Sequence, residues 1–175
     1  MPSISVNLAL LLGGVGIVTG IYWIVVQIRM IRINRFTPHL HAGTDLAIPS
    51  RLFSVVVPAH NEERVIERLV GGILGQKGVD FELIVVLDRC TDRTLERIRA
   101  VAGDDSRLRV VEVEECPEDW AGKCHAATKG AEIATGEWIL FTDADVGFDP
   151  AVLRASAGLM EDLDVDLLSA WTSLS

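Results

Sequence analysis

Residues 52–63 read LFSVVVPAHNEE, an apolar and β-branched run that ends in a proline and a polar turn. A run of this kind is typical of a buried strand, so we expect a strand over Phe53–Val57 that Pro58 ends. A helix should follow, because Asn61 can cap its N-terminus and two glutamates suit its positive first turn. A strand followed at once by a helix is the repeating unit of an α/β fold.

The same alternation continues along the chain. The patterns predict further strands at 83–87, 108–113, 138–142 and 165–170, and further helices that begin at Thr91 or Asp92, at Gly122 and at Asp149–Pro150. Such alternation favours a doubly wound, Rossmann-like α/β domain with a mostly parallel sheet. Ligands of these sheets bind beyond the carboxyl ends of the strands, so the chemistry is expected there.

A long apolar segment precedes this domain. Leu8–Val26 is interrupted only by glycines and a threonine, and at 1.5 Å per residue a helix there would be about 28 Å long, close to the thickness of a bilayer core. Three arginines follow it, the first at Arg29, and no basic residue precedes it. The positive-inside rule therefore predicts an outer N-terminus and a cytoplasmic domain, held in the plasma or inner membrane by one helix at about 7–28.

Two other interpretations of this segment fit the sequence less well. A cleaved signal peptide would carry its positive charges before the apolar run rather than after it. A buried helix of a soluble protein is usually shorter and flanked by caps. The single-pass membrane anchor is therefore the favoured interpretation.

Length and composition limit the domain organisation. The 175 residues suffice for one domain with its own core and hardly for two. We assign residues 1–34 to the anchor, 35–51 to a linker and 52–175 to the α/β domain. A hydrophobic content of 49% argues against disorder, and a net charge of −9 argues against a nucleic-acid partner. An acidic protein that binds phosphates needs local positive charge, such as a divalent cation or a helix N-terminus.

The cysteines and histidines offer no metal site of their own. Cys90, Cys116 and Cys124 match neither a CxxC pair nor a zinc framework, so ordinary thiols are expected. His60 and His125 could be metal ligands or bases, but no second histidine stands at ligand spacing to either. A hydrogen-bonded structural role is therefore expected for both.

Polar residues end three of the expected strands, with PAHNE at 58–62, DRCTD at 88–92 and TDAD at 142–145. Mg²⁺ and Mn²⁺ prefer carboxylate oxygens and bridge to substrate phosphates, so Asp143 and Asp145 are candidate metal ligands. A metal there would neutralise charge on a diphosphate leaving group. The alternative is two solvated aspartates in a turn.

Two further residues are candidates for ligand binding. Asp88 follows a buried strand and could accept hydrogen bonds from a base or ribose, whereas Asp92 is better placed to cap the next helix. Lys123 stands near a helix start, where an ammonium and free backbone N–H groups can meet an anion. The alternative for Lys123 is an ordinary surface lysine, and the full GxxxxGK[ST] phosphate-binding pattern is absent.

Four motifs occur in a familiar order. They are VVVPAHNEE at 55–63, LDRCTDRT at 87–94, Gly122-Lys123, and FTDAD at 141–145. Together they resemble family 2 glycosyltransferases of the GT-A fold over about Phe53–Leu153, and within the family the membrane-associated bacterial members of hopanoid-associated, carotenoid and ceramide types.

The resemblance implies a role for each matching residue. It implies a nucleotide pocket lined by Pro58, Ala59 and Glu62, with Lys123 near the nucleotide. Asp88 would contact the base. Asp143 would face the ribose and the metal-bound diphosphate, and Asp145 would be a metal ligand. It also implies a hexosyltransferase that uses Mg²⁺ or Mn²⁺ and a nucleotide-diphosphate donor, with a UDP-sugar favoured. Transfer would invert the anomeric carbon, and the acceptor would be a lipid or a glycan.

Members of the family continue with an acceptor-binding half that carries the catalytic base, so the base is expected beyond Ser175. Two other functions are alternatives. A sugar-phosphate nucleotidyltransferase usually opens with a glycine-rich, basic loop after its first strand, unlike Pro58–Asn61. A non-catalytic, membrane-tethered nucleotide-binding protein is the other alternative.

Overall fold

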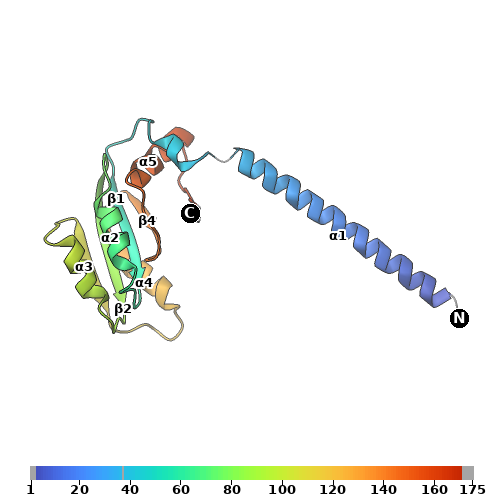
Figure 1. Ribbon diagram of the computed structural model, residues 1–175, viewed down its shortest axis with the longest axis horizontal. Coiled ribbons are helices and arrows are strands. Elements are labelled where there is room, and N and C mark those ends of the chain that lie inside the picture. The colour runs from blue at the N-terminus through green and yellow to red at the C-terminus, as the bar shows by residue number, and fades with distance from the viewer. Residues whose placement is uncertain (1–2, 37, 171–175) are drawn as a thin grey trace. The chain divides into compact units, whose positions relative to one another are not determined.

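The computed structural model describes residues 3–36 and 38–170 and divides the chain into two compact units, with the boundary after His39. Its elements are α1 (Ser3–Phe36), η1 (Leu40–Gly43), β1 (Leu52–Ala59), α2 (Ile66–Leu74), β2 (Asp80–Asp88), α3 (Thr94–Ala102), β3 (Leu108–Val113), α4 (Gly122–Ile133), β4 (Trp138–Phe141) and α5 (Val152–Leu163). Figure 1 labels the helices and most of the strands.

The first unit is the helix α1. It is longer at both ends than the predicted 7–28. Within it, Leu11–Arg32 has 22 residues with a mean hydropathy of 1.9, none of them buried, so this part is long and apolar enough to cross a membrane. Thr19, the polar residue inside the apolar run, donates its hydroxyl to the Val15 carbonyl at 2.8 Å, which satisfies it within the helix.

The second unit is built on a sheet of four parallel strands in the order β3-β2-β1-β4. Val55 of β1 lies between Leu83 of β2 and Leu140 of β4. The prediction of an α/β domain with a parallel sheet is confirmed. β1 and β2 are nearly continuous runs of buried apolar residues, because helices cover both faces of a parallel sheet.

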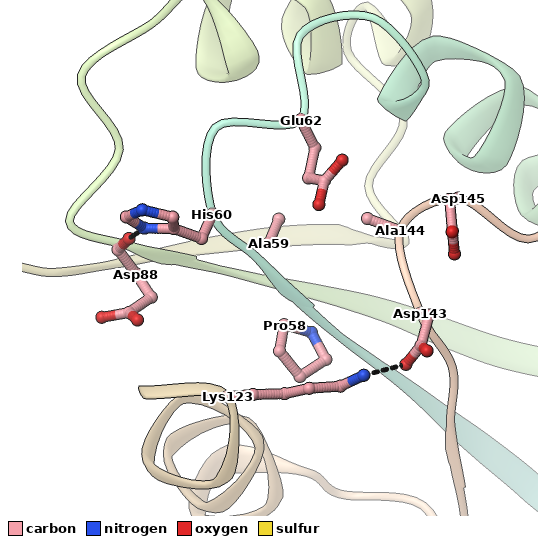
Figure 2. Close-up of a pocket in the computed structure, with 9 residues that line it drawn as sticks. All are labelled: Pro58, Ala59, His60, Glu62, Asp88, Lys123, Asp143, Ala144 and Asp145. Atoms are coloured by element: carbon pink, nitrogen blue, oxygen red, sulfur yellow. Dashed lines mark hydrogen bonds and ion pairs between the residues drawn. The ribbon is translucent and has the colours of Figure 1, made fainter. Parts of the chain in front are cut away.

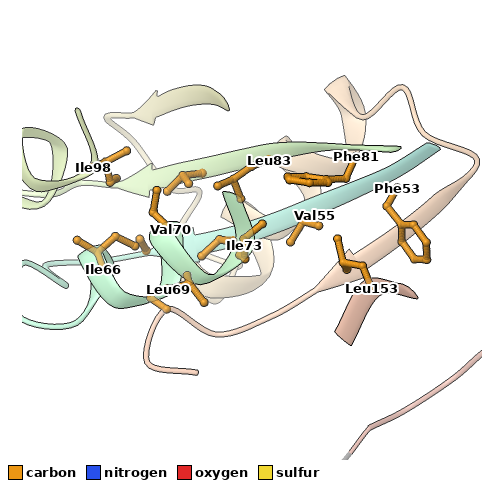
Figure 3. Close-up of a cluster of buried hydrophobic side chains, with 14 of the residues drawn as sticks. Phe53, Val55, Ile66, Leu69, Val70, Ile73, Phe81, Leu83, Ile98 and Leu153 are labelled. Atoms are coloured by element: carbon orange, nitrogen blue, oxygen red, sulfur yellow. The ribbon is translucent and has the colours of Figure 1, made fainter. Parts of the chain in front are cut away.

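Helices pack on both faces of the sheet and give two apolar clusters. On one face, α2, α3 and α5 bury Ile66, Leu69, Val70, Ile73, Ile98 and Leu153 against alternate residues of β1 and β2 (Figure 3). On the other face, Ala126 of α4 packs against Val56, Ile84 and Val86. Gly130 of α4 also lies on Val56, where a Cβ would overlap a side-chain methyl group. Strand residues alternate between the two faces, so both clusters follow from one sequence pattern.

Pro58 lies inside β1, although the sequence analysis expects it to end the strand. The pairing of β1 with β2 continues to Ala59, opposite Leu87. Backbone groups alternate sides along a strand, and the Val56 carbonyl accepts from Thr142 N at 3.2 Å, so Pro58 also faces the β4 side. The ladder with β4 ends at Val56, and the missing N–H of Pro58 therefore costs no hydrogen bond.

The predicted strand at 165–170 is wrong, since the structure assigns no strand there. Asp164 takes a left-handed conformation that ends α5, and Leu167 is 84% exposed. Within the described residues β4 pairs with β1 alone, and Phe141 on β4 is 56% exposed. An apolar run forms a strand only where a sheet edge completes its backbone hydrogen bonds, and these residues do not reach one.

Three helices begin later than predicted. α2 begins at Ile66, five residues after Asn61, and α3 begins at Thr94 rather than at Thr91 or Asp92. α5 begins at Val152, after a turn in which Asp149 accepts from Ala151 N at 3.0 Å. Asp92 and Asp149, two of the residues expected as caps, instead hold the turns that precede α3 and α5.

The segment 35–51 is not uniform. α1 extends to Phe36, and Leu40–Gly43 forms a 3₁₀ turn that packs on α5. Gly43 is buried against Ala155 so closely that a Cβ would overlap the Ala155 carbonyl oxygen. Arg154 reinforces the contact by donating its Nε to the Thr44 carbonyl at 2.8 Å. The second half of this segment therefore belongs to the folded domain.

Asn61 joins the loop after β1 to the loop after β2. Its φ is 56°, and its Oδ1 accepts from Thr91 N at 2.8 Å and from Asp92 N at 3.3 Å. Two parallel bonds connect the same loops, from Glu62 N to Thr94 Oγ1 at 2.8 Å and from Glu63 N to Asp92 Oδ2 at 3.1 Å. Asp92 thus has the structural role expected of it, and the two loops at the carboxyl edge form one unit.

Glu82 organises the opposite, amino edge of the sheet. Its Oε1 accepts from Ser54 Oγ and from both N and Oγ1 of Thr135, each at 2.7 Å. Arg109 donates to its Oε2 at 3.3 Å, and Ser54 Oγ also accepts from Gly136 N at 2.8 Å. Burial alone raises the pKa of Glu82. The hydrogen bonds lower it by more, so that the pKa is about 2. One ionised carboxylate therefore ties β1, β2 and β3 to the turn before β4.

This arrangement predicts an acid-sensitive fold. The folded pKa of Glu82 is about 2 against 4.5 for a free glutamate. The ionised form thus stabilises the fold above about pH 4.5, and this contribution, of the order of 2–3 kcal/mol, is lost as the pH falls toward 2. In Glu82→Gln the unfolding free energy should be lower at pH 6 and should fall less between pH 6 and pH 2.5.

Guanidinium unfolding of the full chain in detergent micelles, followed by tryptophan fluorescence, measures both quantities. Glu114→Gln removes an exposed carboxylate and serves as the control. Identical pH dependence in wild type and Glu82→Gln would contradict the assignment.

The loop junction gives a second prediction. Asn61→Ala removes two hydrogen bonds and leaves a side chain at positive φ, so it should lower the unfolding free energy by about 1–3 kcal/mol. Asn61→Gly loses the same bonds without the strain and should be less destabilising. Hydrogen exchange should be faster at the Thr91 and Asp92 amides in both variants. Unchanged exchange at these amides would show that the junction does not order the loop.

Candidate functional site

A cavity of about 260 Å³ lies at the carboxyl edge of the sheet (Figure 2). It is lined by Pro58, Ala59, His60, Glu62, Asp88, Lys123, Asp143, Ala144 and Asp145. Every residue predicted for the site is in this set, together with His60 and Ala144, which were not predicted for it. Residues 65 positions apart in the chain, such as Pro58 and Lys123, meet here because parallel strands end at one edge.

Asp88 forms the buried end of the cavity. It is 4% exposed and closes β2, and its two carboxylate oxygens accept from Nε and Nη2 of Arg89, each at 2.8 Å. The hydrogen bonds from Arg89 lower the pKa of Asp88, so the carboxylate stays ionised. The pair can form between neighbours because Arg89 has a φ of 49°, which turns its side chain back toward Asp88.

Arg89 is thus a charged neighbour of the site that the sequence analysis missed. Its proximity to Asp88 depends on a left-handed backbone conformation, and arginine carries no sequence signal for one. His60 was expected to be structural, and its Nδ1 does donate to the Asp88 backbone carbonyl. The same ring also lines the cavity, so His60 has both a structural contact and access to a ligand.

Asp143 and Asp145 lie on the opposite side of the cavity, after β4. Ala144 between them is 5% exposed and belongs to the apolar core. Both carboxylates lie outside this core, and both residues are exposed. The small buried residue therefore fixes the turn and leaves the two carboxylates at the cavity, as the spacing of the motif requires.

Lys123 closes the third side of the cavity. It is the second residue of α4, and its Nζ lies 2.6 Å from Asp143 Oδ1 (Figure 2). Gly122, the first residue of α4, packs against the other end of the cavity. A Cβ at Gly122 would overlap Asp88 Oδ2 and lie 2.6 Å from Arg89 Nη2. The start of α4 thus touches Asp88 with one residue and Asp143 with the next.

The donor set is suited to one hard divalent cation. Among the described residues no group of three histidine, cysteine or acidic side chains is placed to hold a metal alone. Mg²⁺ and Mn²⁺ are commonly held by one or two carboxylates together with substrate phosphates, and Asp143 and Asp145 supply two carboxylates. The site fits a metal that binds together with a diphosphate.

Cys90 and His125 are not among the groups proposed to hold a metal. Cys90 accepts from Asn61 N at 3.3 Å and donates to the Ala59 carbonyl at 3.4 Å, and burial raises the pKa of its thiol. It is therefore a structural thiol. His125 packs edge-on against Trp120 at 5.7 Å. Its Nδ1 is buried without a hydrogen-bond partner among the described residues, so the hydrogen-bonded role expected of it is not seen at this atom.

Known proteins similar to this chain carry the same type of domain. A dodecaprenyl-phosphate galacturonate synthase from Rhizobium johnstonii is 31% identical over 134 residues, which cover 74% of this chain and 38% of the relative. Glycosyltransferase GlyG from Streptococcus pneumoniae is 35% identical over 119 residues, which cover 68% of this chain and 38% of the relative. The chain thus spans less than two fifths of the length of these relatives.

Solved structures agree with the sequence matches. A mannosyltransferase from Pyrobaculum calidifontis in complex with GDP-Man and Mn²⁺ matches with a TM-score of 0.62 and 25% identity, over 81% of this chain and 41% of that one. Staphylococcus aureus TarS 1–349 in complex with UDP-GlcNAc matches with a TM-score of 0.55 and 28% identity, over 63% of this chain and 31% of that one.

The parallel sheet is thus that of a GT-A domain. The family model described as glycosyl transferase family 2 matches residues 54–172, about two thirds of the sequence. The chain therefore belongs to glycosyltransferase family 2.

Proposed function

We propose that this chain is the donor-binding part of a glycosyltransferase that moves a sugar from a nucleoside diphosphate to an acceptor. One observation carries the proposal. A single cavity collects an ionised aspartate at one end, two exposed carboxylates at the other, and a lysine beside them. The aspartate suits a nucleotide base, the two carboxylates suit a metal-bound diphosphate, and the lysine suits a phosphate oxygen.

Each residue is given a role in donor binding. Asp88, held ionised by Arg89, accepts a hydrogen bond from a ring N–H of the base, for which uracil is favoured. Pro58 and Ala59 form the wall along the nucleotide, with Glu62 at its rim. Asp143 and Asp145 would hold Mg²⁺ or Mn²⁺, and the metal would supply positive charge to offset that of a departing diphosphate. The solved relatives with UDP-GlcNAc and with GDP-Man and Mn²⁺ support this assignment.

The acceptor is proposed to be a lipid or a glycan. The relative named as a dodecaprenyl-phosphate galacturonate synthase acts on a lipid phosphate by its name, and α1 is suited to hold the domain at a bilayer. In this arrangement α1 crosses the plasma or inner membrane once and the domain lies in the cytoplasm, where Arg29 and Arg32 favour its location. A metal-dependent hexosyl transfer with inversion needs a base near the acceptor hydroxyl. From the family resemblance we propose that this base lies beyond Ser175.

Metal-dependent binding of UDP tests the donor site. Calorimetry on the full chain in detergent micelles should show UDP binding that is strengthened by Mn²⁺, because the metal joins the diphosphate to two carboxylates. Asp145→Ala should weaken the Mn²⁺-supported binding by about tenfold or more, about 1.4 kcal/mol. Asp104→Asn, at an exposed turn after α3, is the control and should bind as wild type does. If the affinity for UDP changes neither with Mn²⁺ nor in Asp145→Ala, the two carboxylates have a structural role instead.

A further inference from the structure

Lys123 and Asp143 form an ion pair within the donor cavity. The ammonium lies 2.6 Å from Asp143 Oδ1, while both side chains remain more than half exposed. No ion pair reaches Asp145 in the part of the chain that the structure describes. The two carboxylates proposed to hold the metal are therefore unequal, since one already has a cation and the other is open.

The backbone position of Lys123 is set by the packing of the residues around it. Gly122 fits against the Asp88–Arg89 pair with no space for a Cβ, so the start of α4 cannot move toward β2. Ala126, one turn further along α4, is fully buried and holds the helix against the sheet. From this fixed start Lys123 extends beside Pro58 to Asp143 (Figure 2). The ammonium is thus held within reach of the metal side of the cavity.

A divalent cation and this ammonium compete for one oxygen. A metal that binds Asp143 through Oδ1 must displace the ammonium or share the carboxylate with it, and like charges at such distances repel. With only two carboxylates available, the metal gains little in return. When a diphosphate enters, its oxygens offer the ammonium a new anionic partner a short distance away. Asp143 is then free for the metal.

We propose that Lys123 couples metal binding to nucleotide binding: it holds Asp143 while the cavity is empty and transfers to the diphosphate when the donor binds, which releases Asp143 to the metal. This inference rests on the proposed donor site and adds its regulation. Its consequence is a cation site that is weak alone and strong in the presence of the nucleotide. By thermodynamic reciprocity the metal strengthens nucleotide binding by the same factor.

The test uses Mn²⁺ alone and Mn²⁺ with saturating UDP, titrated into the full chain in detergent micelles. Electron paramagnetic resonance of free Mn²⁺ gives both dissociation constants, and their ratio is the coupling factor. Lys123→Met should tighten the binding of Mn²⁺ alone by about two- to fivefold, the range expected from loss of an exposed ion pair. The same variant should weaken UDP and lower the coupling factor. A part of the coupling should persist, because the metal also binds the diphosphate directly.

Two variants separate the ion pair from a general change of charge. Lys129→Met removes a lysine from the same helix whose partner is Glu132 at 2.9 Å, outside the cavity, and it should leave the affinity for Mn²⁺ unchanged. Lys123→Arg keeps the charge and should retain most of the coupling. Circular dichroism confirms that each variant is folded.

The outcomes distinguish the inference from the proposed function. If wild type binds Mn²⁺ and UDP but Lys123→Met leaves the affinity for Mn²⁺ alone the same or weaker, the coupling role is overturned and the donor site stands. An equal gain in Lys129→Met also overturns it, because the effect would then be one of net charge. If wild type binds neither Mn²⁺ nor UDP, the donor site is wrong and the coupling role falls with it.

Discussion

The pairing between β1 and β4 is limited by a proline that has no backbone N–H. Pro58 lies in the strand between β2 and β4 and faces the β4 side, where a further hydrogen bond from β1 would be needed to continue the ladder. β4 therefore stops pairing at Val56, and the chain after it turns away through Asp143. β1 continues beside β2 for three more residues. The gap that opens between these strand ends holds the ligand-binding groups, so the site follows from the place where one ladder must end.

Much of this could be predicted from the sequence. The runs that form β1–β4 are short, apolar and bounded by polar turns, and a parallel sheet collects their ends at one edge whatever the details of packing. That rule alone placed Asp88 and Asp143 at one cavity. Lys123 was a candidate from its place near a helix start, and the family resemblance added Pro58, Ala59 and Glu62; all four line the cavity. Roles for these residues come from chemistry and from the resemblance, and they stay predictions until binding is measured.

What the sequence did not predict depends on backbone geometry and on neighbours distant in the chain. Arg89 pairs with Asp88 from a backbone with positive φ. Asn61 was expected to cap a helix, but its side chain reaches the next loop instead, and a local pattern does not distinguish these two uses of an amide oxygen. The expected strand at 165–170 failed for a similar reason, because apolar character does not supply a strand to pair with.

The unpaired side of β4 has a consequence for how this chain behaves in solution. β4 has a partner on one side only within the described residues, and Ile139 and Phe141 on it are 43% and 56% exposed. An apolar edge with free backbone groups is a template on which another strand can add. In a larger protein, further chain could shield it. At high concentration the isolated domain would tend to self-associate along this edge.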